Sequence, residues 1–169
     1  MLLLLAFALP GCRRAQEDAG PGQPASAGPA GLASMVHTND PRSAAQLVSG
    51  FYGIEQNAWR WTAQRFAVDL KPPAGAAQKG ASLNVQLAVP DAILDKLKSV
   101  SLTATIGSTS LPPETYMQAG SFSYVRDVPA NLLAGDTVRI NFQLDKALPP
   151  GQDARELGVI VKSVALDAK

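Results

Sequence analysis

Hydrophobic and polar residues alternate one by one in several short runs between residue 66 and the end of the chain. Because successive side chains of a β-strand point to opposite faces, this period predicts strands with one buried face and one face in water. The clearest run is residues 138–144, where Val, Ile, Phe and Leu are interleaved with Arg, Asn and Gln. The run at residues 157–166 is apolar on both faces over part of its length, which is typical of a central strand. The other predicted strands are residues 66–70, 83–89, 100–106 and 122–124.

Pro, Gly and Asp residues lie between these runs and indicate turns that reverse the chain. Only residues 91–99 have the spacing of a helix, with Asp91 placed to cap the first turn. A helix this short serves only as a connection. About seven or eight short strands with one such helix predict an all-β fold, an antiparallel β-sandwich over residues 46–169.

The chain begins with a short apolar segment followed by its single cysteine. The run from Leu2 to Leu9 is too short to span a bilayer as a helix, so we expect residues 1–11 to be a signal peptide. Leu9 stands three places before Cys12, which resembles the bacterial lipobox, whose cysteine receives diacylglycerol and becomes the mature N-terminus. An ordinary signal peptide with an unrelated cysteine is the alternative. The lipobox implies that acylated Cys12 anchors the protein in the bilayer of the bacterial cell envelope, and Arg13 resembles the pattern that permits export to the outer membrane.

The segment that follows Cys12 has the composition of a disordered chain. Ala, Gly, Pro, Gln and Ser dominate it, and such a sequence cannot bury enough apolar surface to offset chain entropy. We therefore expect residues 12–45 to be a lipidated tether that contributes nothing to the fold. His37, the only histidine, lies in this tether and is expected to be a solvated bystander.

Charge and composition exclude several classes of function. With 15 Lys and Arg residues against 14 Asp and Glu spread along the chain, no basic stripe indicates nucleic acid. Beyond residue 45 there is no histidine and no cysteine, which excludes Ser-His-Asp and Cys-His catalysis and metal sites of His or Cys type. Nothing in the spacing of Glu55 and Glu156 selects them for glycoside cleavage, and Asp153 with Glu156 offers too few oxygens for calcium. We expect no enzymatic activity, no cofactor and no metal.

Two stretches carry a resemblance to a known family. They are GFYGIEQNAWRWT, residues 50–62, and LDKALPPGQDARELGVIVKSVAL, residues 144–166. Together they resemble a bacterial jelly-roll module of the galactose-binding-like, carbohydrate-binding type. The resemblance implies a jelly-roll sandwich of a kind that occurs with glycosyltransferases and on surface lipoproteins, but it fixes no ligand. The matching positions are Glu55, Arg60, Trp61, Asp153, Arg155 and Glu156.

Both tryptophans lie in the first stretch, at alternating positions. In an extended segment Trp59 and Trp61 share one face, and Arg60 lies on the other. We expect Trp61 to pack under the edge of the sandwich with its indole N–H on a backbone carbonyl. Trp59 is a candidate for stacking on a sugar ring while Asn57, Glu55 and Arg60 bind the hydroxyls, and a position in the core is its alternative.

The charged residues of the two stretches permit a further interpretation. The first and last strands of a jelly roll commonly lie side by side, so Glu55 and Arg60 can face Arg155 and Glu156 and close the sheet with charge-assisted hydrogen bonds. We favour this structural role, and all four residues remain candidates for ligand binding. The sequence thus predicts a membrane-anchored, non-catalytic module that binds carbohydrate. The alternatives are an envelope assembly protein that binds another protein, and an accessory domain of a carbohydrate-active enzyme.

Overall fold

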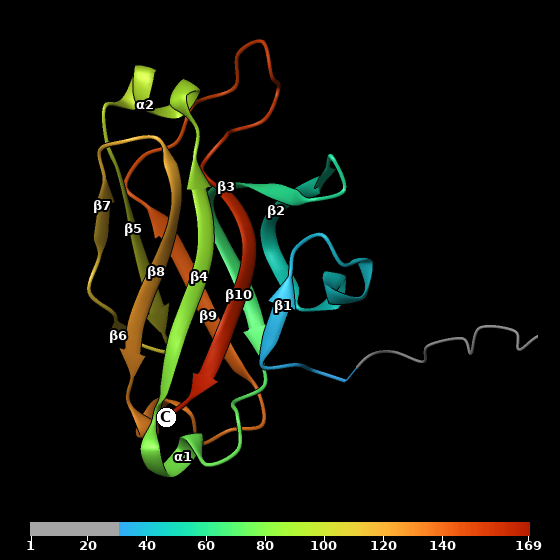
Figure 1. Ribbon diagram of the computed structural model, residues 1–169, viewed down its shortest axis with the longest axis vertical. Coiled ribbons are helices and arrows are strands. Elements are labelled where there is room, and N and C mark those ends of the chain that lie inside the picture. The colour runs from blue at the N-terminus through green and yellow to red at the C-terminus, as the bar shows by residue number, and fades with distance from the viewer. Residues whose placement is uncertain (1–30) are drawn as a thin grey trace, which may run out of the picture.

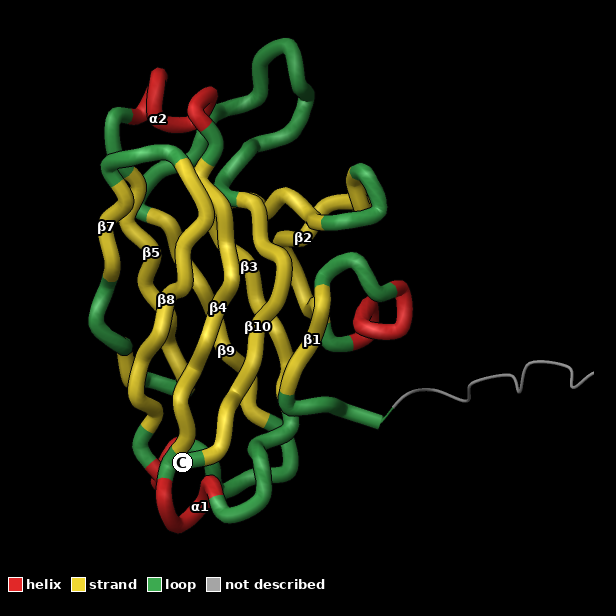
Figure 2. Tube along the Cα trace, in the orientation of Figure 1, coloured by secondary structure: helices red, strands yellow, loops and turns green. Residues whose placement is uncertain are grey.

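The computed structural model describes residues 31–169, so the predicted signal peptide, Cys12 and the first part of the tether lie outside the described residues. Ten strands, all paired antiparallel, form the two layers of a β-sandwich (Figures 1 and 2). The fold class predicted from the alternation of residues is therefore confirmed. No helix of residues 31–169 is long and apolar enough to cross a membrane.

One layer has a fully paired strand in its interior. This strand, β10 (Ile160–Ala168), pairs with β4 (Ala81–Val89) on one side and with the short β1 (Met35–His37) on the other. The outer edge of β4 pairs with β8 (Gly120–Val128). The position of β10 confirms the prediction of a central strand from its apolar run.

The facing layer is built around β3 and β9, which pair over six residues of each strand. β5 follows β9, β2 extends the layer beyond β3, and the short strands β6 and β7 pair with β5 at the other end. The strands of this layer are β2 (Leu47–Glu55), β3 (Trp59–Leu70), β9 (Val138–Leu144), β5 (Val100–Ile106), β6 (Thr109–Ser110) and β7 (Glu114–Tyr116).

Strand β3 joins the two layers. Its second half pairs with β9, whereas its first half pairs with β10 at Arg60 and Trp61. At the junction Thr62 donates its backbone N–H to the Val159 carbonyl at 2.9 Å and accepts from the Gly158 N–H at 2.7 Å. The sheets therefore separate at Thr62, and the side of β3 that carries this residue faces the core.

The helical segments are all short connections. The predicted helix at residues 91–99 is found as α2 (Asp91–Leu97), although Pro90 and not Asp91 occupies the N-cap. The structure adds α1 (Ala76–Lys79) and the 3-10 helices η1 (Pro41–Ala45) and η2 (Ala130–Leu132). It also has more strands than the seven or eight expected. The strands β1, β6 and β7 are only two or three residues long, which is too short for an alternation to be visible in the sequence.

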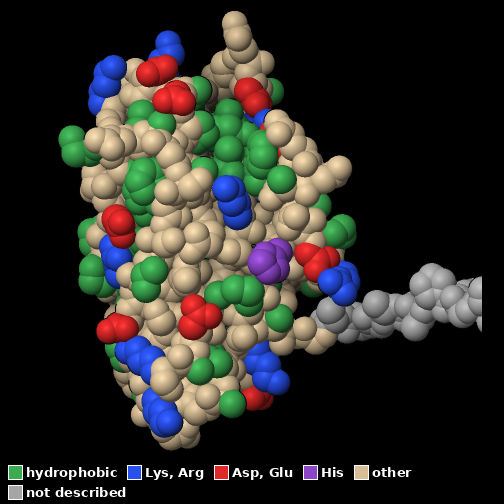
Figure 3. Space-filling model, viewed as in Figure 1, with side chains coloured by type: hydrophobic (Ala, Val, Ile, Leu, Met, Phe, Trp, Pro, Cys, Tyr) green, Lys and Arg blue, Asp and Glu red, His purple; other side chains and the backbone are tan. Residues whose placement is uncertain are grey.

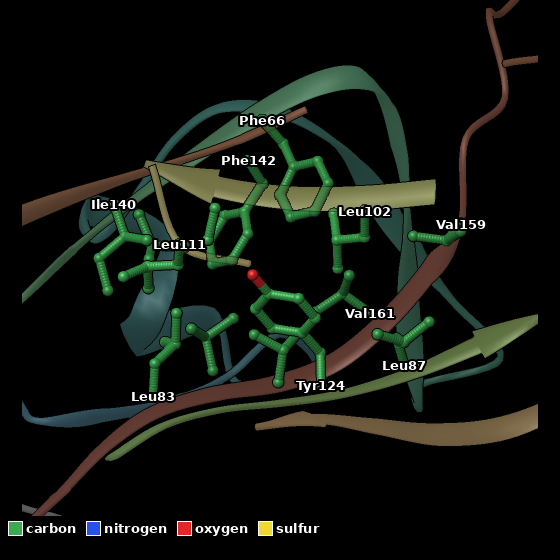
Figure 4. Packing of buried hydrophobic residues seen from close by; sticks show 14 of the residues in the cluster. Phe66, Leu83, Leu87, Leu102, Leu111, Tyr124, Ile140, Phe142, Val159 and Val161 are labelled. Carbon is green, nitrogen blue, oxygen red and sulfur yellow. The ribbon is translucent and has the colours of Figure 1, made fainter. Parts of the chain in front are cut away.

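The core lies between the two layers and follows the alternation of the sequence. In β4, β5 and β9 every second residue is buried. The rings of Phe66 and Phe142 stack at 4.8 Å, and the Tyr124 ring enters from the opposite layer (Figure 4). Continuous apolar contact across both layers is what holds the sandwich together.

The folded part begins earlier than residue 46, which corrects the predicted domain boundary. β1 pairs with β10, and Val36 lies in the core with 1% of its surface exposed. Thr38 is fully buried and donates its hydroxyl to the Val161 carbonyl at 2.6 Å. The prediction missed Val36 and Thr38 because one strand of three residues barely changes the average composition of residues 12–45. His37, at the end of β1, is exposed as expected.

We predict that a chain beginning at Gln46 is less stable than one beginning at Gly31 by more than about 2 kcal/mol. The shorter chain loses the buried Val36 side chain and exposes one edge of β10, and burial of one such side chain alone contributes about 1.5 to 3 kcal/mol. Urea unfolding of both chains and of the full chain measures the difference. Equal midpoints for the two shortened chains would contradict the placement of β1.

Candidate functional site

The predicted contact between the two ends of the domain exists. Arg155, in the loop before β10, pairs with Glu55 at the end of β2 at 2.8 Å and with Asp153 at 2.7 Å. Its guanidinium lies 5.1 Å from the centre of the Tyr52 ring, and the Tyr52 hydroxyl donates to the Glu156 carbonyl at 2.8 Å. The side chain of Glu156 takes no part in the cluster. These contacts attach the loop to β2.

The charges in this cluster are compensated within the protein. Hydrogen bonds from the side chain and backbone of Arg155 lower the pKa of Asp153 to about 2, so the carboxylate is ionised throughout the physiological range. The carboxylates of Asp153 and Glu55 both face one guanidinium. Among residues 31–169 no three metal-ligating side chains come together. The structural role that we favoured for Glu55 and Arg155 agrees with this geometry.

The other predicted site residues do not join the Arg155 cluster through ion pairs, although Arg60 bonds the backbone of Tyr52. Arg60 donates to the carbonyls of Thr38 and Tyr52, both at 2.7 Å, and so links β2 to the residue that follows β1. Asn57 lies in the exposed turn between β2 and β3 with a φ of +54°, and its carbonyl accepts from Asn39. The structure therefore does not bring Asn57, Arg60 and Glu156 into one pocket.

Both tryptophans are half-buried in the first part of β3. Trp61 packs against the edge of the core cluster, as predicted, but none of residues 31–169 accepts a hydrogen bond from its indole N–H. The ring nitrogen of Trp59 is buried and has no partner among the same residues. Trp59 is thus less exposed than a freely accessible stacking platform.

A groove of about 530 Å³ lies between α2 and the loop that carries Arg155. Hydrophobic side chains gather in this part of the surface (Figure 3), and Leu97, Leu148 and Leu157 line the groove. The polar side chains at its rim are few, and two of them, Asp153 and Arg155, are already paired with each other. The groove therefore offers little to a ligand that is rich in hydroxyl groups.

The outer face of β3, β9 and β5 is polar, unlike the hydrophobic groove. The alternation of each strand places Thr103, Gln143 and Arg65 in one row across the sheet and Thr105 and Asn141 in the next. Neighbouring strands are about 4.8 Å apart, and successive outward residues about 7 Å. A hollow of about 150 Å³ lies over these rows, and Ser49 of β2 forms part of its wall. We call these six residues the polar face.

The side chains of the polar face have no hydrogen-bond partner within residues 31–169, although amides and hydroxyls bond readily. Pairs that are satisfied lie on both sides of it. Arg139 donates to both carboxylate oxygens of Asp69 at 2.8 Å, which lowers the pKa of Asp69, and Ser101 bonds Thr115 at 2.7 Å. The free groups are therefore confined to the middle of the sheet.

The amides on the opposite layer differ in this respect. Gln86 donates to Asn84 at 2.9 Å and accepts from Ser123 at 3.0 Å, so the outward side chains of β4 and β8 bond one another. Both layers expose polar residues to water, but only the polar face leaves its amides available. This contrast marks the polar face as the candidate binding surface.

Reasoning from the sequence missed the polar face. A signal was present, because residues 139, 141 and 143 alternate with core residues and two of them are uncharged amides. The pairing of Gln143 with Thr103 and Arg65, however, depends on the register of three strands that are far apart in sequence. The predicted binding site rested instead on the aromatic and charged residues at the two ends of the domain.

Comparison with known proteins gives few matches. No protein-family model matches the chain, and no curated protein does. One similar solved structure is TmCBM27, a carbohydrate-binding module with specific mannan recognition, at 15% identity and a TM-score of 0.46, covering 80% of this chain and 95% of that one. Another is a CBM4 structure, at 12% identity and a TM-score of 0.36, covering 79% and 85%. With both TM-scores below 0.5, the fold assignment rests on the strand pairing itself.

Proposed function

We propose that the domain is a non-catalytic module that binds a carbohydrate chain on the polar face. The observation that carries this proposal is the pair of free amides, Asn141 and Gln143, in the middle of a rigid sheet. An amide side chain both donates and accepts hydrogen bonds, as a sugar hydroxyl does. Side chains on strands hold their positions better than side chains on loops, which reduces the cost of ordering them on binding.

The shape of the polar face suits an extended ligand. Its two rows cross three strands, and a hollow of about 150 Å³ lies above them. The half-buried rings of Trp59 and Trp61 lie farther along β3. A chain of sugars that lies across the strands would place hydroxyls on the amides, and the apolar side of one ring can approach an indole.

The test is polysaccharide binding by a double variant, Asn141→Ala with Gln143→Ala. We expect its affinity for the bound glycan to fall by at least about tenfold, since each lost hydrogen bond costs about 0.5 to 1.5 kcal/mol. Affinity electrophoresis against a panel of neutral and acidic polysaccharides measures this loss, and thermal unfolding checks that the exposed substitutions leave the fold intact.

The matched control is Asn84→Ala with Gln86→Ala on the opposite layer. It removes the same two amides from another outward-facing pair of positions, and these amides bond each other in the structure. We expect it to keep full affinity. If the control loses binding and the Asn141 and Gln143 variant keeps it, the binding site lies on the layer of β4 and β8, and its proposed position on the polar face is wrong. If the panel gives no binding at all, the proposal fails.

The proposal includes the place of the module in the cell. The lipobox resemblance at Cys12 supports a bacterial envelope lipoprotein, with the outer membrane favoured by Arg13. The described domain starts at residue 31, so the segment between Cys12 and residue 31 would separate it from the lipid. A module anchored in this way would attach the cell envelope to a polysaccharide.

We predict that Cys12→Ser moves the protein from the membrane fraction to the soluble fraction or leaves its precursor unprocessed. Acylation needs the thiol, and two or more acyl chains are needed for stable anchoring. Labelled palmitate incorporation in a bacterial host is the direct measurement. Failure of the wild-type protein to take up the label would contradict the anchor and leave the proposed binding face untouched.

A further inference from the structure

Arg65 is the exceptional arginine of the domain. The other five arginines of residues 31–169 all donate hydrogen bonds to carboxylates or backbone carbonyls. Arg65 is exposed on β3 and donates to none of the described residues. Its guanidinium carries a positive charge and five N–H groups in a planar fork. The polar face therefore contains one cation without a protein partner.

The surroundings of Arg65 place this charge in the proposed binding surface. It is the only charged residue among those that line the hollow, and Gln143 lies directly opposite it on β9. Two carboxylates next to this part of the sheet already accept hydrogen bonds from other residues. Asp69 accepts hydrogen bonds from Nε and Nη2 of Arg139, and Asp145 accepts a hydrogen bond from the Ser101 N–H at 2.7 Å. Neither of them compensates Arg65 by an ion pair.

We infer that the ligand of the polar face is an anionic polysaccharide, one whose sugars carry carboxylate or sulfate groups. This inference rests on the proposed carbohydrate-binding function. The planar guanidinium fork of Arg65 matches two oxygens of either group, and such charge-assisted bonds are about twice as strong as neutral ones. The hydroxyls of the same chain would bond Asn141, Gln143 and the threonines. The charge of Arg65 thus selects among glycans, and the amides hold the chain.

The test compares three probes on the full chain. Polygalacturonate supplies carboxylates, dextran sulfate supplies sulfates, and a neutral panel of mannan, xylan and dextran supplies neither. We expect the protein to bind at least one of the two acidic polymers, and Arg65→Gln to weaken that binding about tenfold or more, the effect of losing a charge-assisted pair. Which acidic polymer responds identifies the anionic group.

The matched control is Arg42→Gln. Its side chain is 72% exposed and lies in η1, so the variant removes the same charge from a position off the polar face. Equal weakening by both variants would show diffuse attraction to a polyanion and overturn the inference. Binding to the neutral panel alone would also overturn it, while the proposed carbohydrate-binding function would stand. No binding to any probe would overturn both.

Discussion

Gly50→Ala is expected to destabilise the domain by about 3 kcal/mol or more. Gly50 lies in β2 with a φ of +73°, a conformation that strains any residue with a Cβ. A Cβ there would collide with the Arg65 carbonyl oxygen and lie 2.7 Å from the Phe66 Cα. Backbone atoms cannot move aside as the end of a flexible side chain can, so overpacking adds to the strain. Urea unfolding at constant m-value measures the loss.

Gly53→Ala is the matched control because Gly53 lies three residues farther along the same strand. No atom lies within 4 Å of the Cβ that it would carry, and its φ is outside the left-handed region. We expect a change of less than about 0.5 kcal/mol, since a surface substitution without strain is close to neutral. Similar unfolding midpoints for the two variants would show that β2 does not approach β3 as closely as the structure places it.

The strands that the sequence predicted best are those with one face in the core. β5 and β9 have the bounds that the alternation indicates, residues 100–106 and 138–144. Both strands bury every second side chain, so a shift of one residue would expose the whole apolar set. Burial on one face is the physical cause of the alternation, and the alternation is therefore a reliable guide to such strands.

The strands that were not predicted do not bury one face over several residues, so no alternation appears in their sequence. β1 has three residues and one buried side chain, Val36, which is too short for any period to appear. The turn between β2 and β3 contains Gln56 and Asn57 at positive φ, where glycine is the usual signal. Pairing with β10 and with the turn at Asn39 stabilises these segments. Tertiary contacts of this kind cannot be read from local composition.

The candidate site divides in the same way. The pairing of Glu55 with Arg155 was predicted from the two ends of the domain meeting, although β2, which carries Glu55, pairs with β3 and not with the last strand, β10. The availability of Asn141 and Gln143 was not predictable, because an amide on β4 looks identical in sequence and is bonded to its neighbour. Whether a polar side chain is free depends on what lies opposite it in the sheet. Register, rather than residue type, therefore distinguishes the polar face from the other outer face.

Tyr124→Ala is expected to cost about 4 kcal/mol, the usual range for truncation of a buried aromatic residue. Tyr124 is fully buried, and its ring points from β8 into the centre of the core (Figure 4). The guanidinium of Arg126 lies 4.2 Å from the centre of the ring and loses its contact in the variant. Removal of the ring leaves a cavity between the layers that the paired strands cannot close.

Tyr124→Phe separates the ring from its hydroxyl. The hydroxyl donates to the Pro112 carbonyl at 2.9 Å, but Arg126 Nε donates to the same carbonyl at 2.6 Å. The phenylalanine variant therefore leaves no buried acceptor without a partner, and we expect a loss of only about 1 kcal/mol. Val125→Ala on the same strand, with Val125 47% exposed, should cost less than either. If Tyr124→Phe costs as much as Tyr124→Ala in urea unfolding, the hydroxyl and not the packed ring joins β8 to the rest of the domain.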